Sequence, residues 1–170
     1  AICCQILLSL LFIINGISIA NLTENYQLGL FNLLLMPNSI SIIFGIIILD
    51  LAIYGQHIAM HRYPLLWRLH QVHHTDVILN ATSGIRFHPL EALLSMCYRS
   101  CIILLLGLPV ISVICFETIL NSMSLFSHAN IKLPKKLDIR LRKILITPKL
   151  HVIHHTINYQ DQNHNFGFST

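Results

Sequence analysis

Histidine is the residue type whose number and spacing in this sequence could do chemistry. The chain has 11 histidines among 170 residues. Eight of them form three clusters with helical spacing: His57 and His61 in HIAMH; His70, His73 and His74 in WRLHQVHHTD; and His151, His154 and His155 in KLHVIHHTIN. At this composition a His-x-x-His-His pattern is expected by chance only about 0.05 times. Two copies beside a spaced pair therefore indicate a shared role.

The spacing of these clusters suits the binding of transition metals. Residues three and four apart lie on one face of a helix, with Cβ atoms about 5–6 Å apart. Neutral imidazole nitrogens are common metal ligands, and imidazoles buried without a metal would leave polar nitrogens unsatisfied. Eight ligands are too many for one tetrahedral zinc ion. They suit two ions, each with four or five nitrogen ligands and with open positions left over.

Two other kinds of metal enzyme are excluded by motifs that the sequence lacks. Zinc peptidases use His-Glu-x-x-His, and soluble carboxylate di-iron proteins use Glu-x-x-His pairs. Neither pattern occurs in this chain. The five cysteines form no Cys-x-x-Cys motif and lie in apolar surroundings, as is typical of packing residues. The metal ligands are therefore expected to be almost all imidazole.

The composition indicates a membrane protein rather than a soluble one. Hydrophobic residues make up 54% of the chain and charged residues 11%, with a mean hydropathy of +0.66. Soluble domains carry about 25% charged residues. The net charge is +4, but the basic residues stand beside apolar runs, which favours a membrane surface over nucleic acid as the partner.

The apolar runs predict an all-α, integral-membrane bundle of about four transmembrane helices. Residues 1–20 and about 39–55 are two spans, and residues 92–126 form a hairpin of two more, broken at Gly107-Leu108-Pro109. A cleaved signal peptide is the alternative for residues 1–20. We expect one membrane-embedded domain over residues 1–170, with the histidine motifs within about residues 45–168. The sequence is expected to be a fragment that is incomplete at both ends.

The placement of Lys and Arg predicts the orientation of this bundle. The connection at residues 21–38 has no Lys or Arg, whereas residues 57–91 have three and residues 127–170 have seven. By the positive-inside rule, both histidine-bearing segments face the cytoplasm as a helical cap. Residues 137–146, LDIRLRKILI, predict a helix that lies in the membrane interface or, equally, packs as an ordinary cytosolic helix.

Taken together, the motifs resemble those of the fatty acid hydroxylase superfamily, also called the sterol desaturase family. The matching segments are DLAIYGQHIAMHR, LWRLHQVHHTD, NATSGIRFHPLE, FSHANIKLP, TPKLHVIHHT and NHNFGF. The resemblance implies an integral-membrane, non-haem di-iron oxygenase located in the bacterial inner membrane or the endoplasmic reticulum. Two Fe ions would be its cofactors and O2 its co-substrate.

The resemblance also implies the residues of the site. The expected ligands are His57, His61, His70, His73, His74, His128, His151, His154 and His155. Some members of the superfamily carry a further histidine where this chain has Ser124, and His88 or His164 could replace it. Five polar residues are expected to orient the imidazoles through their non-ligating nitrogens: Asp50, Asn80, Arg86, Glu91 and Asn130. Asp50 as a plain charge at a helix end is the alternative.

The expected function is hydroxylation or desaturation of an unactivated C–H bond of a lipid such as a sterol, a fatty acyl chain or an alkylglycerol. Reducing equivalents would come from a separate donor of the cytochrome b5 or ferredoxin type, because the sequence contains no such domain. A non-enzymatic membrane metal-binding or metal-transport protein is the alternative. Transporters generally place ionisable groups at the bilayer midplane, whereas these histidines flank the apolar runs.

Overall fold

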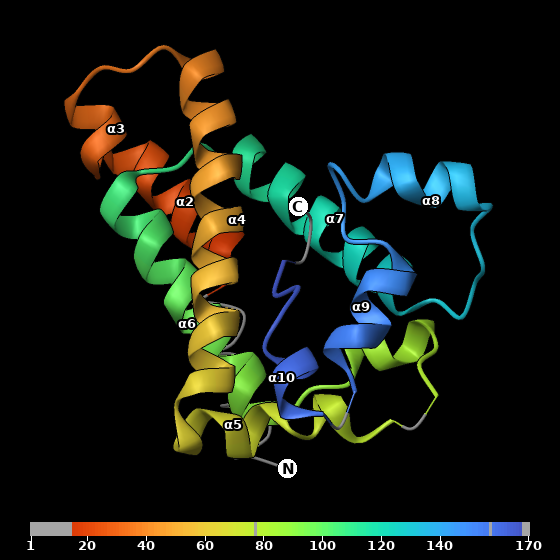
Figure 1. Ribbon diagram of the computed structural model, residues 1–170. Coiled ribbons are helices and arrows are strands. Elements are labelled where there is room, and N and C mark those ends of the chain that lie inside the picture. The colour runs from red at the N-terminus through yellow and green to blue at the C-terminus, as the bar shows by residue number, and fades with distance from the viewer. Residues whose placement is uncertain (1–14, 77, 157, 168–170) are drawn as a thin grey trace. The chain divides into compact units, whose positions relative to one another are not determined.

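The structure is a computed structural model that describes residues 15–76, 78–156 and 158–167. Within these ranges it is helical without strands, which confirms the predicted all-α fold (Figure 1). The helices are α2 (Gly16–Tyr26), α3 (Leu30–Leu33), α4 (Asn38–Arg62), α5 (Pro64–His70), η1 (His73–Thr75), η2 (Ala81–Ile85), α6 (Pro89–Leu106), α7 (Val110–His128), α8 (Lys135–Leu141), α9 (Pro148–His154) and α10 (Tyr159–Gln162).

Three helices of the described residues, α4, α6 and α7, are long and apolar enough to cross a membrane. They have 25, 18 and 19 residues, close to the roughly 20 that a span requires. On α4, large apolar side chains such as Phe44 and Leu51 are more than half exposed, a surface that suits hydrocarbon rather than water. The first predicted span lies mostly outside the described residues, whose first helix starts at Gly16.

The predicted break between the two halves of the hairpin is confirmed. Gly107 has φ +68° and separates α6 from α7, and Gly29 has φ +93°. A Cβ on Gly29 would come within 2.2 Å of the Gly107 nitrogen, so only glycine fits at this contact. Arg99 of α6 and Glu117 of α7 pair at 3.0 Å, which compensates two charges within apolar helices.

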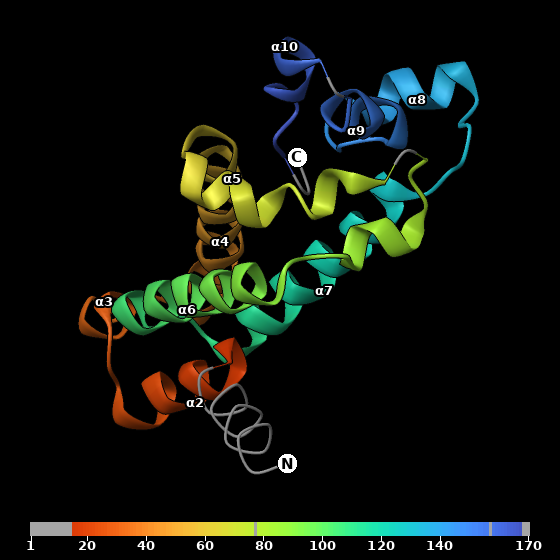
Figure 2. The same ribbon diagram turned by 90° about the horizontal axis from the view of Figure 1, so that it is seen from below.

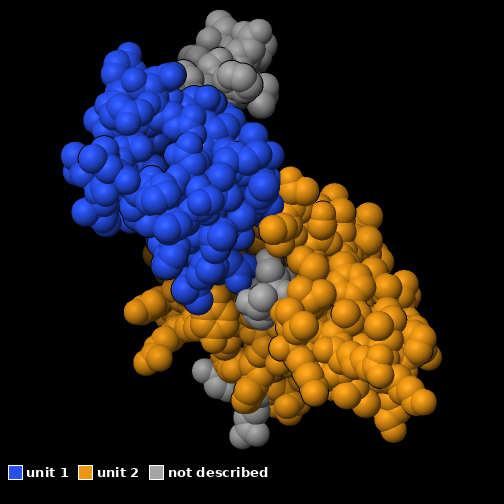
Figure 3. Space-filling view, turned by 90° about the horizontal axis from the view of Figure 1, so that it is seen from above, with its two compact units in different colours: residues 1–52, 92–117 blue, residues 53–91, 118–170 orange. Residues whose placement is uncertain are grey.

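The chain divides into two compact units, coloured separately in Figure 3. Unit 1 comprises residues 1–52 and 92–117, and unit 2 comprises residues 53–91 and 118–170. Every histidine proposed as a ligand belongs to unit 2, together with Glu91. The expectation of a single domain over residues 1–170 stays a prediction.

Unit 2 is built from short helices joined by tight turns. The chain leaves α4 at Arg62, and Pro64 starts α5 at the position where a missing N–H costs nothing. Pro148 starts α9 in the same way, after the extended residue Thr147. Helices α9 and α10 contact each other (Figure 2). These turns place helix ends, where the histidines lie, inside the unit.

The predicted helix over residues 137–146 is wrong in its second half. Helix α8 ends at Leu141, and the chain then turns back. The Asp138 carboxylate accepts hydrogen bonds from the Arg142 guanidinium and, at 2.8 Å, from the Thr147 hydroxyl. Nine residues of continuous helix would hold Asp138 and Thr147 about 13 Å apart, so this contact requires the turn. Ile144 therefore does not share a helix face with Leu137.

Candidate metal centre

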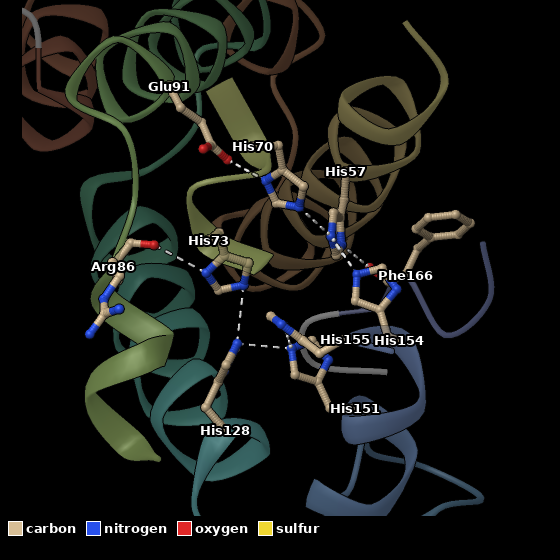
Figure 4. A network of polar contacts seen from close by, with 10 residues as sticks. All are labelled: His57, His70, His73, Arg86, Glu91, His128, His151, His154, His155 and Phe166. Carbon is tan, nitrogen blue, oxygen red and sulfur yellow. Dashed lines mark hydrogen bonds and ion pairs between the residues drawn. The ribbon is translucent and has the colours of Figure 1, made fainter. Parts of the chain in front are cut away.

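The last turns of α4 begin the centre. His57 and His61 are one turn apart, with ring centroids 5.0 Å apart. The Nε2 atom of His57 lies 3.1 Å from Nε2 of His70, at the end of α5, and 3.0 Å from Nε2 of His154, at the end of α9. Residues nearly 100 positions apart in sequence thus bring their ring nitrogens to one point (Figure 4).

All nine histidines predicted as ligands are brought together, in two groups. In each group the available ligand atoms lie within 4.8 Å of one another. Group A consists of His57, His61, His70, His74 and His154, and group B consists of His73, His128, His151 and His155. Within group B, Nε2 of His128 is 3.1 Å from Nε2 of His73 and 3.0 Å from Nε2 of His151.

The two His-x-x-His-His motifs exchange their middle histidines between the groups. In the first motif, His70 and His74 belong to group A and His73 to group B. In the second motif, His151 and His155 belong to group B and His154 to group A. At 3.6 residues per turn, neighbouring residues point about 100° apart, so His154 and His155 face different directions. For the first motif the expectation of a single helix face is wrong, because α5 ends at His70 and His73 lies in η1.

Main-chain carbonyls hold several of the imidazoles by Nδ1. The Nδ1–H groups donate to the carbonyl oxygens of Phe166 (from His57, 2.7 Å), His164 (from His154, 2.8 Å), Arg86 (from His73, 3.2 Å) and Ser124 (from His128, 2.7 Å). A proton on Nδ1 leaves the Nε2 lone pair free for a metal. These contacts therefore select the tautomer that directs Nε2 into the centre.

A carboxylate holds a fifth imidazole. Nδ1 of His70 lies 2.6 Å from Oε1 of Glu91, and both side chains are buried. A carboxylate behind a ligating histidine orients the ring and increases its basicity. This direct contact supports the predicted orienting role of Glu91. Arg86 contacts His73 through its main-chain carbonyl and not through its guanidinium.

The electrostatics of the centre favour neutral imidazoles. Burial lowers the pKa values of His73, His74 and His151, and neighbouring histidines lower them further. Burial also lowers the pKa of His154 to about 4 and that of His155 to about 2. Only unprotonated imidazole binds metal, so these side chains are in the ligand form at neutral pH.

The donor set passes a test of fit for metal ions. Nε2 of His61 and Nε2 of His74 are buried and have no hydrogen-bond partner among the described residues. An unsatisfied buried polar atom is costly, and a metal ion in group A would satisfy both. Nitrogen donors without carboxylates suit iron, copper or zinc rather than magnesium or calcium.

Aromatic side chains surround the two groups. Trp67 lies 5.1 Å from His61 and 5.3 Å from His74, measured between ring centroids. Phe87 stacks on His73 at 4.5 Å, and Phe166 lies 5.6 Å from His57. These rings cover the imidazoles with apolar surface, which excludes water from the donor nitrogens.

The other predicted residues lie outside the two groups. Asn80 caps η2 by accepting a hydrogen bond from the Thr82 amide at 2.9 Å, and Asn130 lines a neighbouring cavity. Asp50 lies in unit 1, two turns of α4 before His57. Ser124 donates its hydroxyl to the Gly84 carbonyl at 2.8 Å. Neither His88 nor His164 belongs to group A or group B.

Sequence reasoning missed the residues that act through their backbone or their small size. The carbonyls of His164 and Phe166 hold two histidines of group A, and the motif NHNFGF was the available signal. Gly84 was also missed. A Cβ at this position would come within 2.7 Å of the Ser124 carbonyl and 3.1 Å of His128 Nδ1, so the approach of η2 to α7 requires glycine.

Comparison with known proteins finds a family match and a curated relative. Residues 42–170 match the model of the fatty acid hydroxylase family. A relative, ornithine lipid hydroxylase OlsE of Rhizobium tropici, is 28% identical over 134 residues, which cover 77% of this chain and 39% of the relative. The chain thus spans about two fifths of the length of that relative. No solved structure matches the chain.

Proposed function

The chain belongs to the fatty acid hydroxylase family, and from that premise we propose that it is an O2-dependent enzyme that hydroxylates an unactivated C–H bond of a membrane lipid. The observation that carries the proposal is the presence of two adjoining groups of buried or half-buried imidazoles, with five and four donors. The relative OlsE is named as a lipid hydroxylase, which supports a lipid as the substrate.

Two iron ions are the cofactor that we assign to these groups. Bound there, they would supply the activation of O2, in which one oxygen atom enters the C–H bond and the other leaves as water, with two electrons and two protons taken up from outside. Group A would hold one ion and group B the other. Because group B has one donor fewer, an ion held there would have more positions left for a small molecule.

The chain's own residues prepare this site. Burial keeps the imidazoles neutral, so that their nitrogens are available as ligands without prior loss of a proton. Glu91 and the carbonyls that accept from Nδ1 hold the rings in fixed orientations. Trp67, Phe87 and Phe166 exclude water, which protects a reactive site from side reactions.

The three apolar helices make the protein an integral-membrane protein. The side of the membrane that the histidine groups face and the electron donor that reaches them are part of the proposal. We assign the histidine groups to the cytoplasmic side, because Lys and Arg are concentrated in the segments that carry them. On that side a soluble donor of the cytochrome b5 or ferredoxin type could deliver electrons. The proposed substrate is a lipid such as a sterol, a fatty acyl chain or an alkylglycerol, and loss of a second hydrogen would give an alkene instead of an alcohol.

A metal-binding or metal-transport protein without catalysis is the alternative function. It is favoured only by the number of imidazoles, which would suit storage as well. A transporter needs ligands near the middle of its spans. Here His57 and His61 lie in the last two turns of α4, and His128 is the last residue of α7.

Metal analysis of protein purified without oxygen separates the two functions. We expect two irons per chain, oxidation of both by O2, and incorporation of isotopically labelled oxygen into a lipid alcohol when a reductant is supplied. His154→Ala should lose bound iron, whereas His88→Ala, outside both groups, should keep it. One zinc per chain with no reaction toward O2 would contradict the proposal and favour the alternative.

A further inference from the structure

A cavity of about 760 Å³ lies in unit 2 and reaches group B at His155. Its wall also includes residues of the segment 129–135, of α8 and of α9. Pockets that bind small molecules have volumes of about 300–1,000 Å³. The cavity can therefore hold the headgroup of a lipid and part of a hydrocarbon chain next to a proposed metal ligand.

Three lysines stand in the wall of this cavity: Lys132, Lys135 and Lys149. All three are exposed, and none makes an ion pair within the part of the chain that the structure describes. Lysines that share a wall repel one another unless an anion lies between them. Their arrangement thus favours a negatively charged ligand.

The two acidic residues of the wall do not compensate these lysines. Asp76 pairs with the Arg86 guanidinium and accepts a hydrogen bond from the Ser83 hydroxyl at 2.5 Å. Asp138 pairs with Arg142 and accepts from Thr147. Each carboxylate is already neutralised by an arginine. The lysines therefore give the cavity a net positive charge.

The remainder of the wall is largely apolar. Ile78, Ile131 and Val152 line the cavity and are exposed by 71%, 49% and 51%. Apolar side chains that remain this open in a concave site mark a place for an apolar ligand. A ligand that matches both halves of the wall is an amphiphile.

We propose that this cavity binds one lipid with an anionic headgroup, whose charge is held by Lys132, Lys135 and Lys149. Its hydrocarbon lies along Ile78, Ile131 and Val152, in the cavity that His155 also lines. The inference rests on the proposed function, because it names the class of lipid that the enzyme would oxidise. An acidic protein could also pair with these lysines. The apolar wall that leads to His155, however, fits a hydrocarbon chain better than the surface of a protein.

Lipid binding to the purified protein in non-ionic detergent tests the proposal. The probes are lysophosphatidylglycerol and lysophosphatidylcholine of equal chain length, which share a phosphate, but the second also carries a cation. We expect the anionic lipid to bind about tenfold more tightly or better, since each of the three lysines attracts the anionic headgroup. Inorganic phosphate should compete only weakly, because it lacks the chain.

Two triple variants of equal charge make the matched comparison. K132Q/K135Q/K149Q should lose the preference for the anionic lipid. K136Q/R140Q/K143Q, which removes three exposed charges outside the cavity wall, should keep it. The variant Ile131→Ser should weaken the binding of both lipids to a similar extent. Metal content serves as the control for folding in every variant.

Three outcomes would overturn the inference. The first is an unchanged preference in the cavity variant, and the second is an equal loss in both triple variants, which would indicate a diffuse surface effect. The third is a cavity variant that keeps its lipid preference and loses only the binding of an acidic electron donor protein. A chain that binds anionic lipid in this way but oxidises no lipid would contradict the proposed function and leave this inference standing. Lipid oxidation that is unchanged in K132Q/K135Q/K149Q would contradict only the inference.

Discussion

Nδ1 of His70 lies 2.6 Å from Oε1 of Glu91, and both side chains are buried. His70 is the histidine at which α5 ends, and Glu91 lies in the first turn of α6. This contact joins a histidine of group A to an acid 21 positions later in the sequence. It provides the most direct way to test whether group A binds a metal.

Removal of the carboxylate should weaken the metal of group A. Loss of a residue that orients a ligand typically reduces metal affinity by about 10- to 100-fold. We expect Glu91→Ala to lower iron affinity within this range and Glu91→Gln to restore part of it, because the amide oxygen still accepts a hydrogen bond. Competition with a chelator measures the affinity. Equal affinities for Glu91→Ala and the wild type would contradict the role of Glu91.

The exchange of the middle histidines between the two groups predicts which histidine variants lose metal from group A and which lose it from group B. Trp67 is the only tryptophan of the chain, and its ring lies 5.1 Å from that of His61 in group A. Paramagnetic Co²⁺ bound in group A should therefore quench its fluorescence strongly. His154→Ala should reduce this quenching, although it belongs to the second motif. His73→Ala, in the first motif, should keep it while losing one of two bound ions.

The opposite pattern would disprove the exchange. If each motif bound its own ion, His73→Ala would reduce the quenching and His154→Ala would leave it unchanged. Cobalt content measured on the same samples separates the loss of an ion from a change in its position.

Substitution of Gly84 should disturb group B through packing. The added Cβ of Gly84→Ala would come within 2.7 Å of the Ser124 carbonyl, which holds His128. Overpacking of this kind costs about 1–3 kcal/mol, and we expect a lower unfolding temperature in detergent and weaker metal binding in group B. Gly55→Ala is the matched control, because its Cβ would meet no atom within 4 Å. That variant should gain up to about 1 kcal/mol from helix propensity. Equal stability of the two variants would contradict the prediction.

The metal-free protein should lose stability on mild acidification. His154 has a pKa of about 4 in the folded protein, lowered by burial, against about 6.5 in an unfolded chain. Between these values the unfolded chain binds a proton that the folded protein does not, so the free energy of unfolding falls as the pH decreases. The loss should begin near pH 6.5 and continue toward pH 4.

Chemical unfolding of the metal-free protein in detergent at a series of pH values measures this effect. His154→Gln, which cannot bind the proton, should show a shallower dependence on pH over the same range. A stability that stays constant between pH 6.5 and pH 4 would argue against the burial of neutral histidines.

Much of the fold could be predicted because its signals are local. The break at Gly107 and Pro109, the apolar run that became α4, and the histidine spacing are each contained within a few dozen residues. The second half of the predicted helix at 137–146 failed because a distant contact, from Asp138 to Thr147, overrides helical periodicity. Asn80 matched a family motif, but local hydrogen bonding uses its side chain as a helix cap.

The sequence by itself predicted the histidines of both groups, since the number, type and spacing of eight of them indicate a nitrogen-rich centre and the family resemblance added His128. It could not determine which histidine joins which group. That depends on where α5 ends, on the direction in which α9 points its last residues, and on main-chain carbonyls such as those of His164 and Phe166. Carbonyls are the same in every residue type, so only the tertiary structure decides which of them lies behind an imidazole.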